Sequence, residues 1–273
     1  MKVGFIQLKP VFGEVARNLE RSIELIREGA EADLLVLPEL CTSGYLFINK
    51  KELKKLGEKV PDGPSTKAWI DVARETNTHI VAGICEKVSE DEFYNSAVLV
   101  GPEGFIDVYR KIHLFNNEKK FFDAGNGPFK IYDLGSAKIG IMVCFDWYFP
   151  EVARILALHG ADIICHPANL VLPFSQRTML ARSIENRIFT ITANRVGDDI
   201  RPNSKLTFTG QSQVTSPKME LLVQASEVEE VVKVVEIDPT LARNKMITAN
   251  NHAFMDRRVD LYTPMMKQDL KKS

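Results

Sequence analysis

Short apolar runs rich in β-branched residues recur along the chain and predict strands at 3–8, 34–37, 80–84, 97–100, 139–143, 163–165, 189–193 and 231–237. Several of these runs do not alternate with polar residues, which is typical of strands that are buried on both faces. Segments with apolar residues at helical spacing lie between them, at about 14–31, from Pro150 to Gly160, and at 175–187. Another helix is expected to carry Trp69 and Val72, with Ser65 or Thr66 as its N-cap. Strands that alternate with helices in this way predict an α/β fold.

One pair of predicted strands is joined too closely for a crossover helix. The segments 80–88 and 94–100 are separated by only a short polar stretch, so we expect them to pair antiparallel within a mixed sheet. The last twenty or so residues differ from the rest, because 250–262 is polar and the end is rich in lysine. A terminal segment of this kind is either frayed or docked on another surface.

Composition excludes several classes of protein. The chain has 273 residues, of which 45% are hydrophobic, and its formal net charge is −1. It offers no basic face for nucleic acid and no apolar stretch of about 20 residues that would cross a membrane. Its start lacks the features of a signal peptide, and its four cysteines form no CxxC pair. We therefore expect a cytoplasmic protein whose cysteines are reduced, with no nucleic-acid or membrane partner.

Three residues at the ends of predicted strands carry candidate chemistry. Glu39 follows the strand at 34–37, Lys111 follows a strand that ends near Tyr109, and Cys144 lies between a strand and the helix that begins at Pro150. Ligand sites in open α/β sheets collect beyond the carboxyl ends of strands, so a base, a cation and a nucleophile can meet there. Taken singly, each has an ordinary interpretation as a solvated glutamate, a surface lysine or a small core residue.

Taken together, the flanking residues resemble the nitrilase, or carbon–nitrogen hydrolase, superfamily, whose signature is a Glu-Lys-Cys triad. The matching segments are 37–40 around Glu39, 110–114 around Lys111 and 144–151 from Cys144, and further matches occur at 181–187 and 256–262. The resemblance covers nearly the whole chain. It implies a four-layer α-β-β-α sandwich, with a carbon–nitrogen hydrolase domain at 1–250 and a C-terminal tail at 251–273 that docks at the interface of a homodimer or larger homo-oligomer.

The triad chemistry follows from the residue types. A neutral thiol is a poor nucleophile, so Cys144 needs Glu39 as a general base. Lys111 is expected to stabilise the thiolate first and then the oxyanion, and a backbone N–H just after Cys144 helps to stabilise the oxyanion. The helix N-terminus that follows Cys144 is expected to favour the thiolate. The resemblance also implies a second glutamate in the site, and Glu118 matches it. The reaction proceeds through a thioester and requires neither a metal nor an organic cofactor.

The substrate is less strongly indicated. The motif Cys144-Phe145-Asp146 resembles the amidase and carbamoylase branches more than true nitrilases, so a small aliphatic amide is favoured over an aliphatic nitrile, and an N-carbamoyl amine comes third. Candidate residues for substrate binding are Tyr45, Phe115, Trp147, Tyr148 and Asn169. His113 and His166 are interpreted as structural histidines. The alternative from another class is a catalytically silent assembly or binding protein on the same fold.

Overall fold

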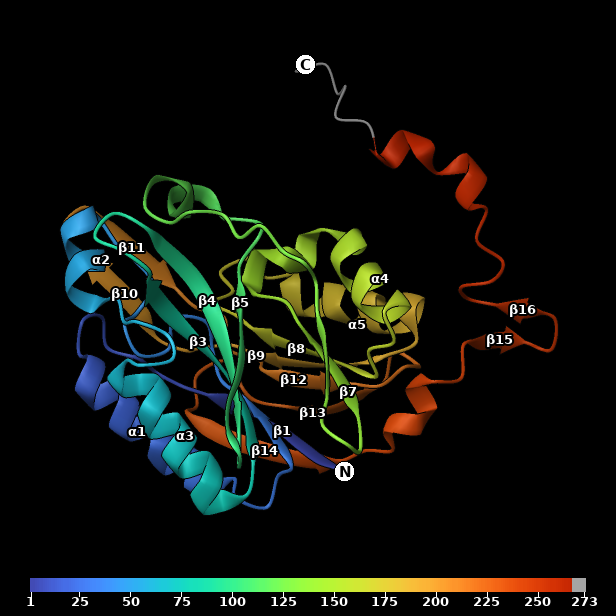
Figure 1. Cartoon of the computed structure of the whole chain (residues 1–273), viewed down its shortest axis with the longest axis horizontal. Helices are drawn as coiled ribbons and strands as arrows, with labels where there is room; N and C mark the ends of the chain where they lie inside the picture. Colours follow the sequence, from blue (N-terminus) through green and yellow to red (C-terminus); the bar gives the residue numbers. More distant parts are fainter. Residues whose placement is uncertain (267–273) are drawn as a thin grey trace.

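Two six-stranded sheets form the centre of the computed structural model, which describes residues 1–266 (Figure 1). The first sheet has the order β14 (Val231–Glu236), β1 (Lys2–Gln7), β2 (Leu34–Val36), β3 (His79–Lys87), β4 (Phe93–Gly101) and β5 (Gly104–Arg110). The second has the order β13 (Leu221–Gln224), β12 (Gln213–Thr215), β9 (Phe189–Ala193), β8 (Ile163–Pro167), β7 (Lys138–Ile141) and β6 (Ile131–Asp133). In each sheet three neighbouring strands are parallel and the others pair antiparallel, which confirms the mixed topology.

Helices cover the outer face of each sheet. The helices α1 (Val15–Glu28) and α3 (Pro64–Thr76) lie on the first sheet, whereas α4 (Pro150–Leu158) and α5 (Ser175–Asn186) lie on the second (Figure 1). The inner faces of the sheets pack on each other through contacts of β1 with β9 and of β2 and β3 with β8. The short helix α2 (Lys50–Leu56) lies at one end, near β3. The layers therefore follow the order α-β-β-α, which confirms the predicted fold class.

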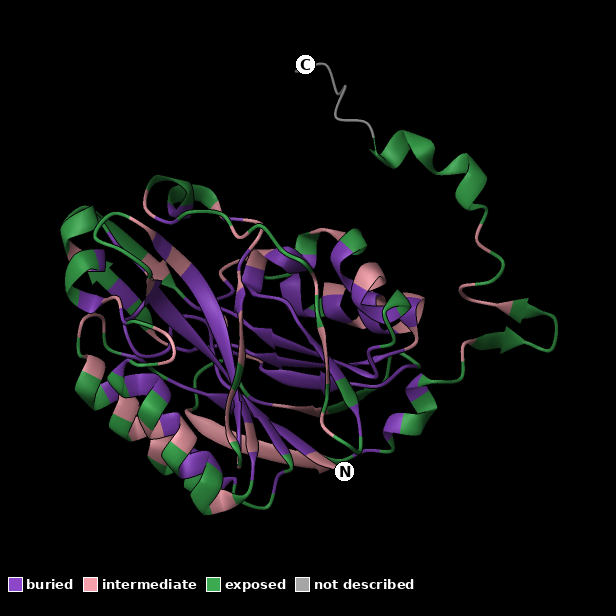
Figure 2. Ribbon diagram, viewed as in Figure 1, coloured by how far each residue is buried: buried purple, intermediate pink, exposed green. Residues whose placement is uncertain are grey.

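The central strands are buried on both faces, as their continuous apolar sequences predict (Figure 2). In β2 and the residue that follows it, Leu34 and Val36 pack in the core between the sheets. Leu35 and Leu37 belong to the separate core under α1 and α3. Alternate side chains of one strand thus stabilise two different layers, because successive residues of a strand point to opposite faces.

The start of α3 corrects one prediction. The N-cap is Gly63 and the first helical residue is Pro64, so neither Ser65 nor Thr66 caps the helix. The Glu58 carboxylate takes that role, because its two oxygens accept hydrogen bonds from the Ser65 N–H and hydroxyl at 2.8 and 2.5 Å. A carboxylate at this position also suits the positive end of the helix dipole.

The C-terminal segment leaves the body of the protein. After the turn η3 (Pro239–Ala242), the chain forms a projecting hairpin of β15 (Met246–Thr248) and β16 (Asn251–His252), followed by the turns η4 (Val259–Leu261) and η5 (Thr263–Met266) (Figure 1). The expected domain boundary at 250 falls within the turn of this hairpin, and 267–273 of the expected tail lie outside the described residues. A further hairpin, β10 (Asp198–Arg201) and β11 (Ser204–Thr207), lies at the opposite end near α2. Among residues 1–266, no helix is both long and apolar enough to cross a membrane.

Candidate active site

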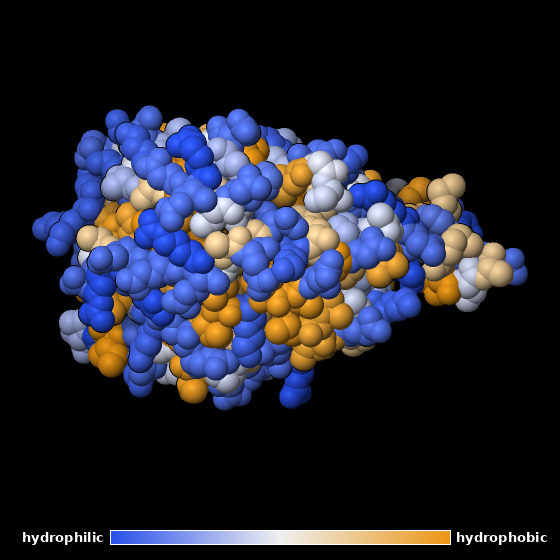
Figure 3. Space-filling model, turned by 90° about the horizontal axis from the view of Figure 1, so that it is seen from below, coloured by the Kyte–Doolittle hydropathy of each residue, from blue (hydrophilic) through white to orange (hydrophobic). Residues whose placement is uncertain are grey.

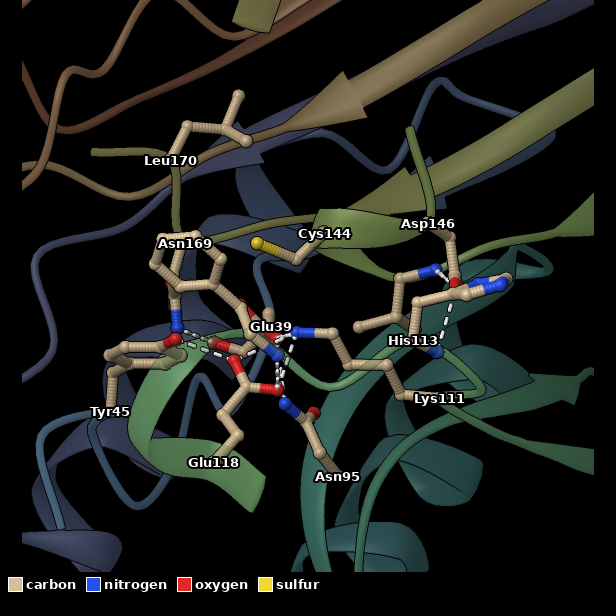
Figure 4. A network of polar contacts seen from close by, with 12 residues as sticks. Glu39, Tyr45, Asn95, Lys111, His113, Glu118, Cys144, Asp146, Asn169 and Leu170 are labelled. Atoms are coloured by element: carbon tan, nitrogen blue, oxygen red, sulfur yellow. Dashed lines mark hydrogen bonds and ion pairs between the residues drawn. The ribbon is translucent and has the colours of Figure 1, made fainter. Parts of the chain in front are cut away.

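The ends of three strands bring Glu39, Lys111 and Cys144 together. Glu39 follows β2, Lys111 directly follows β5, and Cys144 begins the 3-10 turn η2 (Cys144–Tyr148) after β7. Figure 4 shows the Glu39, Lys111 and Glu118 side chains converging, with the Cys144 sulfur directed toward the same space. Glu118 comes from another 3-10 turn, η1 (Asn116–Lys120), in the loop after Lys111. The structure therefore brings together all four residues that the sequence predicts as catalytic.

Lys111 lies between two carboxylates. Its Nζ is 2.6 Å from Glu39 Oε1 and 2.8 Å from the Glu118 carboxylate. The side chains of Lys111 and Glu39 are completely buried, and that of Glu118 is almost so. Buried charges are tolerated when they are paired and hydrogen-bonded, and here one ammonium serves two carboxylates.

Asn95 on β4 fixes the geometry of this pair. Its Nδ2 donates a hydrogen bond of 2.6 Å to Glu39 Oε1, and its backbone carbonyl accepts one of 2.8 Å from the Lys111 N–H. The two partners on Glu39 both occupy Oε1, whereas Oε2 is buried and has no hydrogen-bond partner among the described residues. One carboxylate oxygen is thus held in place and the other is free to accept a proton.

Tyr45 holds Glu118 from the other side. Its hydroxyl donates a hydrogen bond of 2.5 Å to Glu118 Oε1. The backbone N–H groups of Tyr45 and Leu46 both donate to Asp199 at 2.9 Å, and Asp199 pairs with the buried Arg195 at 3.0 Å. A buried ion pair in the second half of the chain therefore anchors the loop that presents the Tyr45 side chain.

Cys144 occupies a strained backbone position. Its φ is +43°, in the left-handed region that residues other than glycine seldom adopt. The His166 Nε2 donates a hydrogen bond of 2.9 Å to the Cys144 carbonyl. Cys144 thus lies between β7 and α4, as the sequence predicts, and the hydrogen bond from His166 holds its carbonyl in place.

Asp146 ties this turn to the lysine loop. Its carboxylate accepts hydrogen bonds from the Tyr109 hydroxyl at 2.7 Å, the His113 N–H at 3.1 Å and the Val143 N–H at 2.9 Å, and it contacts the His113 Nδ1 at 2.7 Å. Because Tyr109 and His113 flank Lys111 in the sequence, one buried carboxylate sets the spacing between Lys111 and Cys144.

Burial and charge set the protonation of the resting site. Burial raises the pKa of the Cys144 thiol well above its usual value, Glu39 raises it further, and Lys111 opposes the shift. Burial also raises the pKa of Glu39, against the lowering effect of Lys111. Although burial acts to lower the pKa of Lys111, Glu118 and Glu39 raise it, so its ammonium stays charged. These shifts favour the neutral thiol over the thiolate in the resting site, so Cys144 needs a base that takes its proton.

A small pocket opens beside Cys144. It is lined by Phe115, Cys144, Phe145, Trp147, Asn169, Leu170, Val171, Leu172 and Ser175. Three of the predicted substrate-binding residues, Phe115, Trp147 and Asn169, are in this set, and Tyr45 and Phe115 line a second pocket next to it. The structure does not bring Tyr148 to either pocket. Tyr148 is 56% exposed and packs against Phe145 and Trp147 instead.

Sequence reasoning gave no role to Asn95, Asp146 or His166 in the site. Asn95 carries the clearest local signal, because it is a polar residue near the start of a buried, largely apolar strand and must find a buried partner. In the sequence, Asp146 and His166 stand out only as polar residues next to apolar runs, which does not indicate a role in the site.

Within residues 1–266, no three His, Cys, Asp or Glu side chains are grouped in the manner of metal ligands.

Comparisons with known proteins identify the family of the chain. The carbon-nitrogen hydrolase family model matches residues 2–245. A protein of Pyrococcus abyssi named nitrilase is 49% identical over 96% of this chain and 99% of its own length. A Pseudomonas protein named (R)-stereoselective amidase is 32% identical over 96% of this chain and 93% of its own length. The crystal structure of a carbon-nitrogen hydrolase from Helicobacter pylori superposes with a TM-score of 0.88 at 27% identity, covering 98% of both chains. The chain therefore belongs to the carbon-nitrogen hydrolase family, the enzymes of the nitrilase superfamily that hydrolyse carbon–nitrogen bonds other than peptide bonds.

Proposed function

We propose that this enzyme hydrolyses the amide of a small, uncharged aliphatic acid and releases ammonia through a thioester on Cys144. The observation that carries the proposal is the difference in surroundings between the two carboxylate oxygens of Glu39. Its Oε1 is held by Lys111 and Asn95, and its Oε2 has no partner among the described residues. A general base needs an oxygen that is free to accept the proton of the nucleophile.

The acylation half of the reaction uses the groups in the site. Glu39 accepts the thiol proton as the Cys144 sulfur attacks the carbonyl carbon of the amide. Lys111 and the Phe145 N–H stabilise the negative oxygen of the tetrahedral intermediate. Glu39 then passes its proton to the amide nitrogen, the carbon–nitrogen bond breaks, and ammonia leaves an acyl thioester on Cys144.

Deacylation restores the resting enzyme. Glu39 removes a proton from a water molecule as the water oxygen attacks the thioester carbon. The carbon–sulfur bond breaks, the sulfur takes the proton back from Glu39, and the carboxylic acid leaves. The raised pKa of Glu39 supports this role, because burial makes its carboxylate a stronger base than an exposed glutamate. Glu118 is assigned to holding the Lys111 ammonium in position.

The pocket beside Cys144 supports a neutral acyl group. Among the described residues that line it, none carries a charged side chain, and Phe115, Trp147 and Leu172 provide apolar walls. A carboxylate or ammonium on the acyl chain would be desolvated there without a partner. We therefore expect propionamide and butyramide to be better substrates than amides with a charged acyl chain.

A small aliphatic nitrile is the second candidate. It is favoured by the name of the Pyrococcus abyssi relative, nitrilase, at 49% identity. Attack by the Cys144 sulfur on a nitrile carbon gives a thioimidate, and addition of water with loss of ammonia leads to the same thioester. The two reactions therefore make the same demands on Glu39 and Lys111.

One ammonia-release assay tests both candidates. Propionamide, propionitrile, the charged amide succinamate and N-carbamoyl ethylamine are compared at equal concentration with the wild-type enzyme and with Cys144→Ala and Cys144→Ser. We expect the highest kcat/KM for propionamide, and no turnover by either variant. Faster release from propionitrile would favour the nitrilase alternative. Turnover by the Cys144 variants at the wild-type rate, or no turnover of any substrate by the folded wild type, would contradict the proposed mechanism.

We also propose that the tail beyond the body packs on a second copy of the chain. In the space-filling view it projects as a narrow extension that carries hydrophobic side chains among polar ones (Figure 3). Val259, Leu261, Met265 and Met266 are all more than 60% exposed. Sedimentation of the full chain and of a chain ending at residue 245 tests this. The full chain should sediment as a dimer or larger assembly and the shortened chain as a smaller species, and equal masses would contradict the proposal.

A further inference from the structure

The carbonyl group of Cys144 is held from within the second sheet by His166. The His166 side chain lies on β8 and is completely buried, and its Nε2 is 2.9 Å from the Cys144 oxygen. Its other ring nitrogen, Nδ1, lies 3.1 Å from the hydroxyl of Thr192. His166 and Thr192 are register partners on the parallel strands β8 and β9, so their side chains point to the same face of the sheet.

These contacts define the tautomer of the ring. A carbonyl oxygen only accepts hydrogen bonds, so the proton must be on Nε2, and Nδ1 then accepts from the Thr192 hydroxyl. Burial lowers the pKa of His166 to about 4, despite the raising effects of the Cys144 carbonyl and Asp146. The ring is therefore neutral near pH 7. The neutral ring donates one hydrogen bond from Nε2 and accepts one at Nδ1. It therefore places no second positive charge near Lys111.

The orientation of the Cys144 carbonyl determines where the next N–H points. The peptide bond between Cys144 and Phe145 is trans, since the only cis bonds among the described residues precede Pro61 and Pro128. In a trans peptide the C=O and N–H point in opposite directions. With its carbonyl tied to His166, this peptide directs the Phe145 N–H away from β8. Within residues 1–266 that N–H has no hydrogen-bond acceptor.

We propose that His166 is a positioning residue that fixes the Cys144–Phe145 peptide plane, so that the Phe145 N–H stabilises the oxyanion formed in the pocket beside Cys144. The inference rests on the thioester mechanism proposed above and deepens it. The left-handed φ of Cys144 is a strained conformation, and a strained peptide keeps one orientation only when surrounding contacts determine it. The His166 hydrogen bond supplies such a contact on the side away from the substrate.

Two reactions of the same sulfur distinguish this role from a general structural one. Hydrolysis of propionamide passes through an oxyanion, whereas alkylation of Cys144 by iodoacetamide is a direct displacement in which no oxyanion forms. His166→Asn retains a polar atom near the Nδ1 position but has none at the Nε2 position. We expect this variant to lose roughly 10- to 100-fold in kcat/KM for propionamide. Its rate of alkylation by iodoacetamide should remain within about threefold of the wild type, since Glu39 and Lys111 are untouched.

Two further variants complete the comparison. The side chain of His166→Gln places an amide near the Nε2 position, so it should recover most of the lost kcat/KM. Thr190→Val removes another buried hydrogen bond of β9, the 2.6 Å contact with Thr215, and serves as the matched control. It should lower the melting temperature without changing either rate. Equal losses of hydrolysis and alkylation in His166→Asn, or no loss of hydrolysis, would overturn the proposal.

A measurement on the wild-type enzyme covers the case in which His166→Asn does not fold. Propionaldehyde adds to Cys144 by forming a carbon–sulfur bond, and the thiol proton moves to the aldehyde oxygen, which then lies where the oxyanion would form. If the Phe145 N–H donates to that oxygen, the peptide is polarised and its carbonyl becomes a stronger acceptor. The Nε2–H proton resonance of ¹⁵N-histidine-labelled enzyme should then move downfield, and an unchanged resonance after adduct formation would overturn the proposal. Neither this measurement nor the alkylation requires amide turnover, so failure of the amidase proposal is seen separately, as wild-type enzyme that releases no ammonia.

Discussion

Glu39 and Lys111 are 72 positions apart in the sequence, yet Glu39 Oε1 and Lys111 Nζ are 2.6 Å apart in the folded protein. Both residues follow strands of the first sheet that point in the same direction, β2 and β5, so the pairing order of that sheet brings their loops to one edge. Asn95, on the strand between β3 and β5, contacts both of them. The ion pair therefore depends on the register of β4 as well as on the two charged residues.

Asn95→Ala is expected to reduce kcat/KM by roughly ten- to a hundredfold, because Glu39 loses the neutral donor that orients its carboxylate. The Asn95 hydrogen bond lowers the pKa of Glu39, so its removal should raise that pKa further. The acidic limb of the pH profile of kcat/KM should therefore move to higher pH. A profile with an unshifted acidic limb would show that Asn95 does not influence Glu39.

Tyr45→Phe is expected to lower kcat about tenfold, because Glu118 loses the hydrogen bond of 2.5 Å that holds it against Lys111. Tyr132→Phe is the matched control. It also removes a hydrogen bond between a tyrosine and a carboxylate, the 3.2 Å contact with Asp107, but it does so away from the site. Steady-state rates and melting temperatures of both variants make the comparison, and similar activities in the two would contradict a role for Tyr45.

Gly83→Ala is expected to displace Glu39. Gly83 lies on β3, and an added Cβ there would overlap the backbone of Pro38 and Glu39. Because the backbone cannot move aside as a side chain can, we expect a loss of about 1–3 kcal/mol in the free energy of unfolding and a large loss of activity. In Gly140→Ala on β7, the atoms nearest to the added Cβ belong to the Leu156 side chain, at 2.9 Å and beyond, so this substitution should affect stability more than activity. Urea unfolding and ammonia release measure the two effects, and full activity in Gly83→Ala would show that the contact does not position Glu39.

Stability should fall in mild acid because of His166. Its pKa is lowered to about 4 in the folded protein, mainly by burial, from an ordinary value of 6.5. Between those two pH values the imidazole of His166 is protonated in the unfolded chain but neutral in the folded chain. The contribution of His166 to the free energy of unfolding is therefore complete above about pH 6.5 and is lost as the pH falls toward 4. The change amounts to about 3 kcal/mol over that range. Urea unfolding of the wild type and of His166→Gln from pH 7.5 to 4.5 tests this, and an identical pH dependence in both proteins would contradict it.

The central strands and the helices α1, α4 and α5 could be predicted from the sequence, because apolar runs and their spacing are local properties. The helix α2 and the short strands β6, β12 and β13 were not predicted. The flanking motifs also placed Glu39, Lys111 and Cys144 just beyond the ends of strands. The predicted cap of α3 was wrong, because Glu58, a residue outside the helix, accepts the hydrogen bond of the Ser65 N–H. The candidate pocket was only partly predicted, since closeness in sequence to Cys144 placed Tyr148 there although its side chain points outward.

The sequence by itself therefore determined the family and the layer architecture, and it predicted which charged and nucleophilic side chains meet in the candidate site. Only the tertiary structure decided which oxygen of Glu39 is free, that burial raises the pKa of the Cys144 thiol, and that His166 holds the Cys144 carbonyl. The physical reason is that apolar periodicity is set by neighbouring residues, whereas hydrogen bonds and desolvation depend on atoms brought within about 3 Å by strand register and sheet packing. Such distances between remote residues are absent from any local pattern in the chain.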